Sequence, residues 1–155
     1  MLSFKILLKY DKIDKIRHTL SHVLAAAVQE LYPNVKFGIG PAIDNGFYYD
    51  IDFGDTKISD ADLPEIEKKM HSIVALKLPM VKRVVSKTEA LNWARDNAQK
   101  YKIELIEELP EKSEISFYDL GDIFTDLCKG PHLQNTSEIG AFKLIRVAGA
   151  YWRGD

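Results

Sequence analysis

Apolar residues recur at helical spacing along the segment that follows Asp11 and Asp14. Their positions are Ile13, Ile16, Leu20, Val23, Leu24, Ala27 and Leu31. A carboxylate from Asp11 or Asp14 can cap the first turn, and Pro33 stops the pattern. The pattern therefore predicts an amphipathic helix that ends near Leu31 and buries these residues on one side.

Several other short segments have the residue patterns of strands. Residues 2–8 alternate between apolar and polar and predict a short N-terminal strand. The other predicted strands cover residues 35–39, 47–53, 80–85, 115–120, 123–128 and 141–147. Turns are predicted at the Asn45-Gly46 pair, and at Gly121-Asp122. In the strand 47–53, the side chains of Phe47, Tyr49, Ile51 and Phe53 share one face.

Two further helices are predicted from their first residues. Pro64 suits the first turn of a helix that runs to about Leu76. Ser86 followed by Glu89 is a capping-box pattern for a helix that runs to about Tyr101. Residues 102–109 are ambiguous and could continue as helix. Together these elements predict an α+β fold with a largely antiparallel sheet packed with helices, and they favour it over a parallel arrangement.

Composition narrows the class of protein. The chain has 155 residues, of which 46% are hydrophobic and 28% charged, and this predicts a single compact domain over residues 1–155. Its 21 basic and 23 acidic residues nearly cancel, which argues against gripping nucleic acid by bulk electrostatics. The single cysteine, Cys128, cannot form an internal disulfide, so we expect a cytoplasmic protein. We see no signal peptide or membrane span and expect no membrane partner.

Two histidines in the first predicted helix are the first candidates for a catalytic or metal-binding role. His18 and His22 are four residues apart, so they lie on one face of the helix, about one turn from each other. That face, with Ala25 and Gln29, is almost opposite the apolar stripe. We therefore expect both imidazoles outside the main packing face, either on a solvated surface or beside a shallow groove that Ala25 and Ala26 leave open.

A second candidate follows the strand 123–128. Cys128 and His132 are separated by Lys-Gly-Pro, which cannot be helical because Pro131 disfavours helix at Gly130. The turn holds a thiol close to an imidazole. Together with the histidine pair, these residues would suit a tetrahedral metal site. They would equally suit a metal-free hydrolytic pocket in which imidazoles position a water. Asp126 points the same way as Cys128 on a strand and could hold an ammonium group.

Other familiar motifs are poorly supported. The stretch 38–41 contains two glycines, but it lacks the following Lys and Ser/Thr of a phosphate loop, so we interpret it as backbone geometry. Histidines occur in the motifs around Cys128, but the sequence that flanks Cys128 does not match the signature of a cysteine-protease nucleophile.

Read together, the motifs resemble the editing domain of bacterial-type threonyl-tRNA synthetases. The resemblance covers the chain from about Lys15 onward. It is carried by Arg17-His18-Thr19-Leu20-Ser21-His22-Val23-Leu24-Ala25, Gly38-Ile39-Gly40-Pro41-Ala42-Ile43-Asp44-Asn45-Gly46-Phe47-Tyr48-Tyr49-Asp50, Tyr101-Lys102-Ile103-Glu104-Leu105-Ile106, Asp126-Leu127-Cys128-Lys129-Gly130-Pro131-His132 and Ala148-Gly149-Ala150-Tyr151-Trp152-Arg153-Gly154-Asp155. The pairing of His-x3-His with Cys-x3-His is shared with alanyl-tRNA editing domains, whereas the Gly-Phe-Tyr-Tyr-Asp and Ala-Tyr-Trp-Arg-Gly-Asp segments favour the threonyl branch.

This resemblance implies post-transfer editing, in which serine wrongly esterified to threonine tRNA is hydrolysed. Its implied partners are the 3′ acceptor end of tRNA(Thr) carrying serine, and the catalytic and anticodon-binding domains of a full-length synthetase. The catalytic core would follow residues 148–155, and residues 1–10 would be an N-terminal strand or extension. We therefore expect an excised domain with no aminoacylation activity.

The resemblance also implies roles for individual residues. The implied catalytic residues are His18, His22, Lys102, Cys128 and His132. The implied substrate-binding residues are Asp126, Tyr49, Gly130 and Pro131, with selectivity against threonine arising from a pocket too tight for its extra methyl group. We expect direct attack by water, no acyl-enzyme on Cys128 and no cofactor.

Two alternatives stay open. One is a zinc-dependent hydrolase of the alanyl-tRNA editing type, in which His18, His22, Cys128 and His132 would be the zinc ligands. The other is a binding module for the tRNA acceptor end that has no catalytic activity. For this domain without the rest of a synthetase we expect weak tRNA affinity, because residues 103–128 contain eight acidic residues and one lysine.

Overall fold

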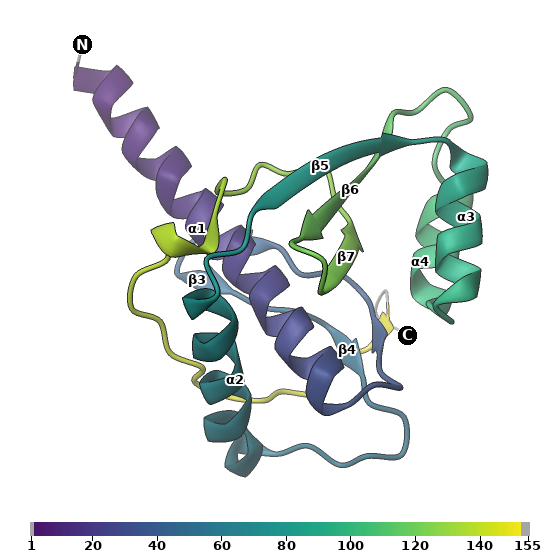
Figure 1. Ribbon diagram of the computed structural model, residues 1–155, viewed down its shortest axis with the longest axis horizontal. Coiled ribbons are helices and arrows are strands. Elements are labelled where there is room, and N and C mark those ends of the chain that lie inside the picture. The colour runs from purple at the N-terminus through teal and green to yellow at the C-terminus, as the bar shows by residue number, and fades with distance from the viewer. Residues whose placement is uncertain (1, 153–155) are drawn as a thin grey trace.

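The computed structural model describes the backbone of residues 2–152 and the side chains of residues 12–152. Its long helix α1 (Leu2–Leu31) lies beside α2 (Leu63–Ala75), and a separate pair, α3 (Lys87–Asp96) and α4 (Lys100–Glu107), lies across the sheet (Figure 1). Short 3-10 helices cover Asp60–Asp62 (η1) and Thr136–Glu138 (η2).

All strand pairs in the described part of the chain are antiparallel. The largest sheet has the order β5-β6-β7, formed by Met80–Val85, Ile115–Leu120 and Phe124–Leu127. Two short ladders join β1 (Lys36–Phe37) to β4 (Ile51–Asp52), and β2 (Ala42–Ile43) to β3 (Gly46–Phe47). The predicted α+β class with antiparallel sheet is therefore confirmed, although the sheet is divided into three parts.

Most predicted boundaries of these strands are close to those observed. Strand β5 covers the predicted residues 80–85, and β6 the predicted residues 115–120. The strands predicted over 35–39 and 47–53 shrink to two-residue ladders, and the first hairpin turns at Asp44-Asn45, one residue before the predicted pair. The residues predicted to share a face of the strand 47–53 all pack against the main core.

The predicted N-terminal strand over residues 2–8 is wrong, because α1 already begins at Leu2. No glycine or proline occurs between residue 1 and Pro33, so nothing in the chain separates this segment from the helix after it. Leu, Lys and Ile at these positions are acceptable in a helix. Period-two alternation over only a few residues was too short a signal to decide between the two structures.

The helix predicted to run to Tyr101 ends earlier, at Asp96, and α4 then begins at Lys100. Ala98 between them adopts a left-handed conformation with φ of 52°, which breaks the helix. Ser86 caps α3, as predicted, by accepting a hydrogen bond from the Glu89 amide at 3.1 Å. The ambiguous segment 102–109 is helical as far as Glu107. This break turns α4 so that Lys102 becomes buried.

The strand predicted over residues 141–147 is also wrong. This segment is extended but does not pair with another strand. Two of its backbone N–H groups instead donate hydrogen bonds to side-chain carboxylates. The Leu144 amide donates to Glu67 at 2.8 Å, and the Val147 amide donates to Asp60 at 2.7 Å. The segment therefore runs across the α2 side of the molecule as a strap (Figure 1).

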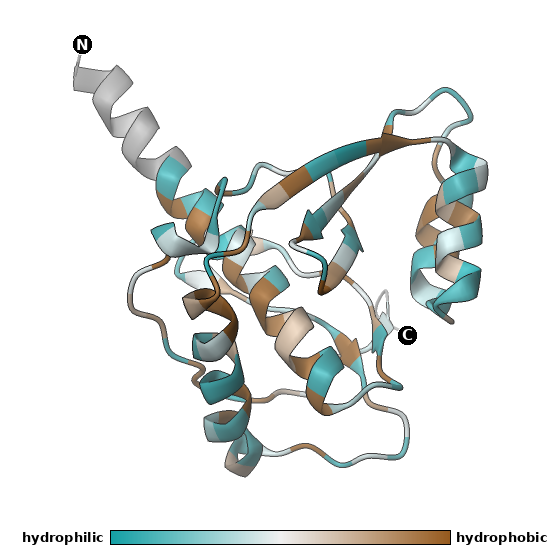
Figure 2. Cartoon of the chain, viewed as in Figure 1, coloured by the Kyte–Doolittle hydropathy of each residue, from teal (hydrophilic) through white to brown (hydrophobic). Residues whose placement is uncertain are grey.

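The main core lies between α1, α2 and the β1–β4 ladder, and a smaller core lies under α3 and α4. Hydrophobic residues recur along both α1 and α2, which lie side by side (Figure 2). Helix α1 is buried on more than its apolar stripe, because Thr19, Ser21 and Ala25 are also inaccessible to solvent. Among the described residues, no helix has the length and apolar character needed to cross a membrane.

Candidate active site

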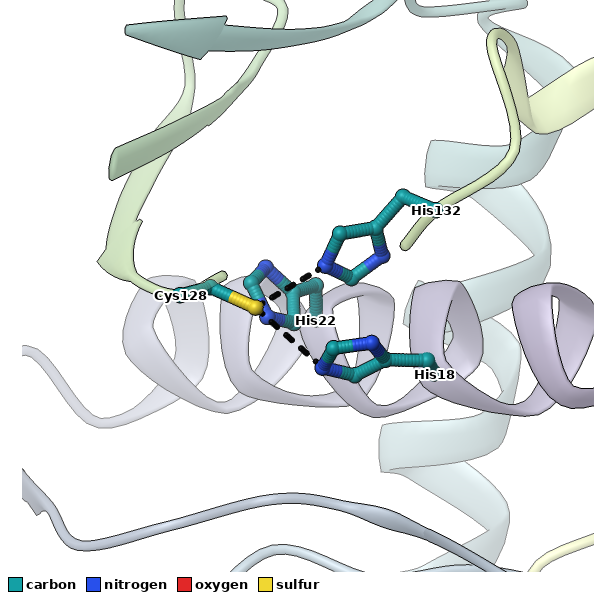
Figure 3. A group of neighbouring side chains, drawn as sticks. All are labelled: His18, His22, Cys128 and His132. Atoms are coloured by element: carbon teal, nitrogen blue, oxygen red, sulfur yellow. Dashed lines mark hydrogen bonds between the residues drawn. The ribbon is translucent and has the colours of Figure 1, made fainter. Parts of the chain in front are cut away.

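The four residues singled out by the two His/Cys motifs meet at one place. His18 and His22 come from successive turns of α1, and Cys128 follows β7 directly. His132 returns to the same point after a turn in which the Gly130–Pro131 bond is cis. One nitrogen or sulfur from each residue lies within 4.8 Å of those of the others. Figure 3 shows these four side chains gathered around the Cys128 sulfur.

Hydrogen bonds set the orientation of the imidazole rings and show which ring nitrogen of His18 carries the proton. The Nδ1 of His18 lies 3.0 Å from the Pro131 carbonyl, which can only accept, so this nitrogen carries the proton. The bare Nε2 of His18 then faces the Cys128 sulfur at 3.2 Å. His132 approaches the same sulfur at 3.3 Å through Nε2, while its Nδ1 lies 3.1 Å from the Thr19 hydroxyl.

One arrangement of protons satisfies all of these contacts. The Leu133 amide donates to the Thr19 hydroxyl oxygen at 3.0 Å, and the hydroxyl donates to His132. His132 donates to the sulfur, and the thiol donates to His18, whose own proton is held by a carbonyl. The result is a directed chain of hydrogen bonds in which all side chains are neutral.

A second group of side chains lies beside the first and is built around a buried ion pair. Lys102 Nζ lies 2.9 Å from Asp126 Oδ1, and both side chains are at least 96% buried. The ammonium also donates to the Tyr49 hydroxyl at 3.0 Å and to the Gly38 carbonyl at 2.7 Å. The Tyr49 hydroxyl in turn donates to Asp126 Oδ2. All three protons of the ammonium are therefore used within the protein.

Burial sets the protonation of the site. It lowers the pKa of His18, His22 and His132. Neighbouring imidazoles lower the pKa of His22 and His132 further, whereas the Pro131 carbonyl and Asp126 partly offset the lowering at His18, so neutral rings dominate at pH 7. It raises the pKa of Cys128 to about 11, so this residue is a thiol rather than a thiolate at neutral pH. The pKa of Tyr49 is raised well above its usual value by burial and by Asp126.

The two groups line one open cavity of about 360 Å³. His18, His22, Lys102, Asp126 and Cys128 all contribute to its wall. The described residues that line it further include Ile39, Gly40, Pro41, Tyr49, Leu105, Leu127, Lys129 and Gly130. His132 and Pro131 stand behind this wall and act on it through Cys128 and His18.

His22 lies deeper than the helical pattern predicted. Its side chain is 2% exposed, whereas we expected a face outside the main packing. The cause is that α1 is covered on both sides, so the face opposite its apolar stripe is buried against the β7–His132 region. His22 Nε2 lies 3.8 Å from Asp126 Oδ2, and its Nδ1 has no hydrogen-bond partner among the described residues.

Two glycines of the site are required by close contacts. A Cβ on Gly40 would collide with the ring of Tyr49, so only glycine lets that ring reach Asp126. Gly130 has φ of 82° and its missing Cβ would collide with the Tyr118 hydroxyl. The interpretation of residues 38–41 as backbone geometry is supported, since Gly38 also supplies the carbonyl that Lys102 binds.

Gly130→Ala should therefore destabilise the protein by roughly 1–3 kcal/mol and disorder the Cys128–His132 turn, because it combines a left-handed φ with a steric clash. Urea denaturation measures the first effect. Gly140→Ala is the matched control, since a Cβ there would meet no atom within 4 Å. Equal stability of the two variants would contradict this account of the turn.

Sequence reasoning missed the contribution of Thr19 and Gly38. Thr19 is fully buried and orients the His132 ring through a hydrogen bond. Nothing in its sequence context distinguishes it from a threonine of the core. Tyr49, an implied substrate-binding residue, lines the cavity, whereas its neighbour Tyr48 is 39% exposed. The different placement of the two tyrosines depends on how the chain turns between β3 and β4, which alternation alone could not decide.

Comparisons with known proteins agree with the resemblance. Residues 115–155 match the family described as the threonyl and alanyl tRNA synthetase second additional domain. The chain is 57% identical over 137 residues to the threonine–tRNA ligase of Bacteroides fragilis, covering 88% of this chain and 21% of that protein. It is 52% identical to the ligase of Clostridium novyi over 142 residues and 50% identical to that of Burkholderia lata over 145 residues. These matches cover 92% and 94% of this chain and 22% of each ligase.

The chain is therefore homologous to one segment of these threonine–tRNA ligases, and its residues 115–155 match the second additional domain of threonyl- and alanyl-tRNA synthetases. It spans about a fifth of the length of the threonine–tRNA ligases that it matches.

Proposed function

We propose that the chain hydrolyses the ester of serine wrongly attached to tRNA(Thr). The observation that carries this proposal is that a neutral imidazole with a fixed tautomer, His18, opens onto the same cavity as a buried carboxylate, Asp126. An aminoacyl ester carries an ester bond, at which a base can activate water, and an ammonium group, which a carboxylate can bind. A base and a carboxylate on one cavity therefore suit this class of substrate. The homology to a segment of tRNA synthetases supports the tRNA part.

Asp126 is the proposed receptor for the seryl ammonium group. Its carboxylate is held by Lys102 and Tyr49, so its orientation is set before substrate arrives. A carboxylate accepts about four hydrogen bonds, and the protein supplies two at short range, which leaves capacity for an ammonium group. Gly130 and the exposed edge of His18 then border the space for the serine side chain.

Water is the proposed nucleophile. The Cys128 thiol must first turn its proton away from His18 Nε2, which frees that nitrogen for water. His18 Nε2 then accepts a proton as the water oxygen bonds to the ester carbon, and the same proton passes to the ribose oxygen as the ester bond breaks. The products are serine and a tRNA with a free 3′ end. His18 is suited to this role because the Pro131 carbonyl fixes its tautomer and because its lowered pKa keeps it neutral at pH 7. An attack by Cys128 is disfavoured because a thiol with a pKa of about 11 is a weak nucleophile.

Lys102 is proposed to orient the site rather than to contact the ester. Its three donors already bind Gly38, Tyr49 and Asp126, so a bond to the ester carbonyl would have to break one of them. This assigns Lys102 a narrower role than the catalytic one that the family resemblance implies.

Selectivity for serine is tested by comparing two substrates. We expect the chain to deacylate seryl-tRNA(Thr) at least about ten-fold faster than threonyl-tRNA(Thr), because a tight pocket excludes an extra methyl group by overlap. The measurement is single-turnover deacylation at high protein concentration. Equal rates would contradict the proposed selectivity, and binding of tRNA with neither ester hydrolysed would favour a binding module.

A zinc-dependent hydrolase is the second candidate, because His18, His22, Cys128 and His132 supply zinc-type donors within 4.8 Å of one another. In a tetrahedral zinc site these atoms would lie about 3.3–3.8 Å apart, so the group would have to contract. Zinc there would supply Lewis-acid polarisation of the ester carbonyl.

Metal analysis separates the two candidates. Our proposal expects well under one zinc per chain after purification without added metal, and hydrolysis that a chelator does not slow. Stoichiometric zinc together with loss of hydrolysis on chelation would favour the second candidate. Thermal unfolding with and without zinc is a further measure, because a bound metal stabilises the folded state.

A further inference from the structure

We propose that Trp152 is a positioning residue that holds Lys102 in place from the outer side of the site. Trp152 lies in the C-terminal segment, which crosses from the α2 side of the molecule to end beside β4 (Figure 1). Its indole nitrogen donates to Glu104 of α4 at 2.7 Å. Its ring packs on Tyr101, the residue before Lys102, with ring centres 4.8 Å apart.

Trp152 also touches the residue that accepts the Lys102 hydrogen bond. A Cβ built on Gly38 would lie 3.2 Å from the Trp152 ring and 3.2 Å from the Asp50 carbonyl oxygen. The backbone of Gly38 is therefore closely packed between the indole and the strand partner, to which its amide donates at 2.8 Å. Its carbonyl is bound by Lys102 at 2.7 Å.

These contacts make one continuous assembly. Tyr101 is tied to the β4 strand by a 2.6 Å hydrogen bond to Asp52, and Lys102 on the next position reaches Gly38. The indole covers the junction at which α4 meets the β1–β4 ladder, so removing it loosens both ends of the Lys102–Gly38 bond at once. Lys102 in turn orients Asp126 and Tyr49, which line the cavity.

The catalytic consequence rests on the proposed hydrolysis of an aminoacyl ester. Trp152→Ala is expected to lower kcat by about ten-fold or more with KM changed less than about two-fold, because displacement of a positioned group by an ångström can cost about 100-fold in rate. Trp152→Phe keeps the ring contacts and should lose less than about three-fold. Tyr151→Ala is the matched control, since its neighbouring aromatic side chain is 77% exposed.

A second readout does not need activity. With ¹⁵N-labelled lysine, the buried Lys102 ammonium should give a slowly exchanging NMR signal, recognised by its contacts with Tyr49. This signal should shift or broaden in Trp152→Ala and stay in place in Tyr151→Ala. An unchanged signal in Trp152→Ala would overturn the inference, as would a raised KM at unchanged kcat. If the wild-type chain hydrolyses no ester, the proposed function fails, and the ammonium signal alone decides the role of Trp152.

Discussion

Replacing Lys102 by methionine is expected to lower the free energy of unfolding by about 3–5 kcal/mol, because it leaves the buried Asp126 carboxylate without its cation. The Tyr49 hydroxyl and the Gly38 carbonyl would also lose their donor. Ester hydrolysis should fall to background, since Asp126 and Tyr49 would no longer be oriented. Urea denaturation and single-turnover deacylation measure the two effects.

Two further variants separate stability from function. Arg83→Met breaks an ion pair with Asp119 that is largely at the surface, and should cost less than about 1 kcal/mol. The double variant Lys102→Met with Asp126→Leu removes both buried charges, and should recover much of the lost stability while hydrolysis stays absent. Recovery of hydrolysis in the double variant would show that the pair has no part in the reaction.

His18→Ala should reduce kcat for seryl-tRNA(Thr) by roughly 10²–10⁴-fold, because it removes the proposed base from a site that is otherwise intact. His18 is half-buried and contacts only the Pro131 carbonyl and the Cys128 sulfur through its nitrogens, so the loss of stability should be small. Circular dichroism melting checks that the variant folds, and the deacylation rate under single-turnover conditions gives the catalytic effect.

His71→Ala provides the matched control for this variant. His71 is exposed and stacks on Phe142 on the α2 side, away from the cavity, with ring centres 4.3 Å apart. It should retain the wild-type rate. If His18→Ala lost no more activity than His71→Ala, another group would have to be the base.

The sequence predicted the parts of this structure that local patterns control. The apolar period around Leu20, the capping by Ser86 and the bounds of the strand β5 each reflect patterns within one element, and each is confirmed. The segment 141–147 has the alternation of a strand but binds carboxylates of Glu67 and Asp60 instead of a neighbouring strand. That choice depends on residues about 77–87 positions away, which no local pattern contains.

The same distinction applies to the site. The pairing of His18 with His22, and of Cys128 with His132, follows from spacing within single motifs, and the structure brings both pairs together. Lys102, Tyr49 and Asp126 come from three distant segments, and only the family resemblance indicated that they share a pocket. The burial of His22 depends on the covering of both sides of α1, which helical periodicity does not report.

The rate of hydrolysis of seryl-tRNA(Thr) by the wild-type chain, relative to the rate in buffer, tests the central claim most directly. We predict a large acceleration at neutral pH that falls by roughly 10²–10⁴-fold in His18→Ala while this variant stays folded. A wild-type chain that binds seryl-tRNA(Thr) but hydrolyses it no faster than buffer would contradict the account.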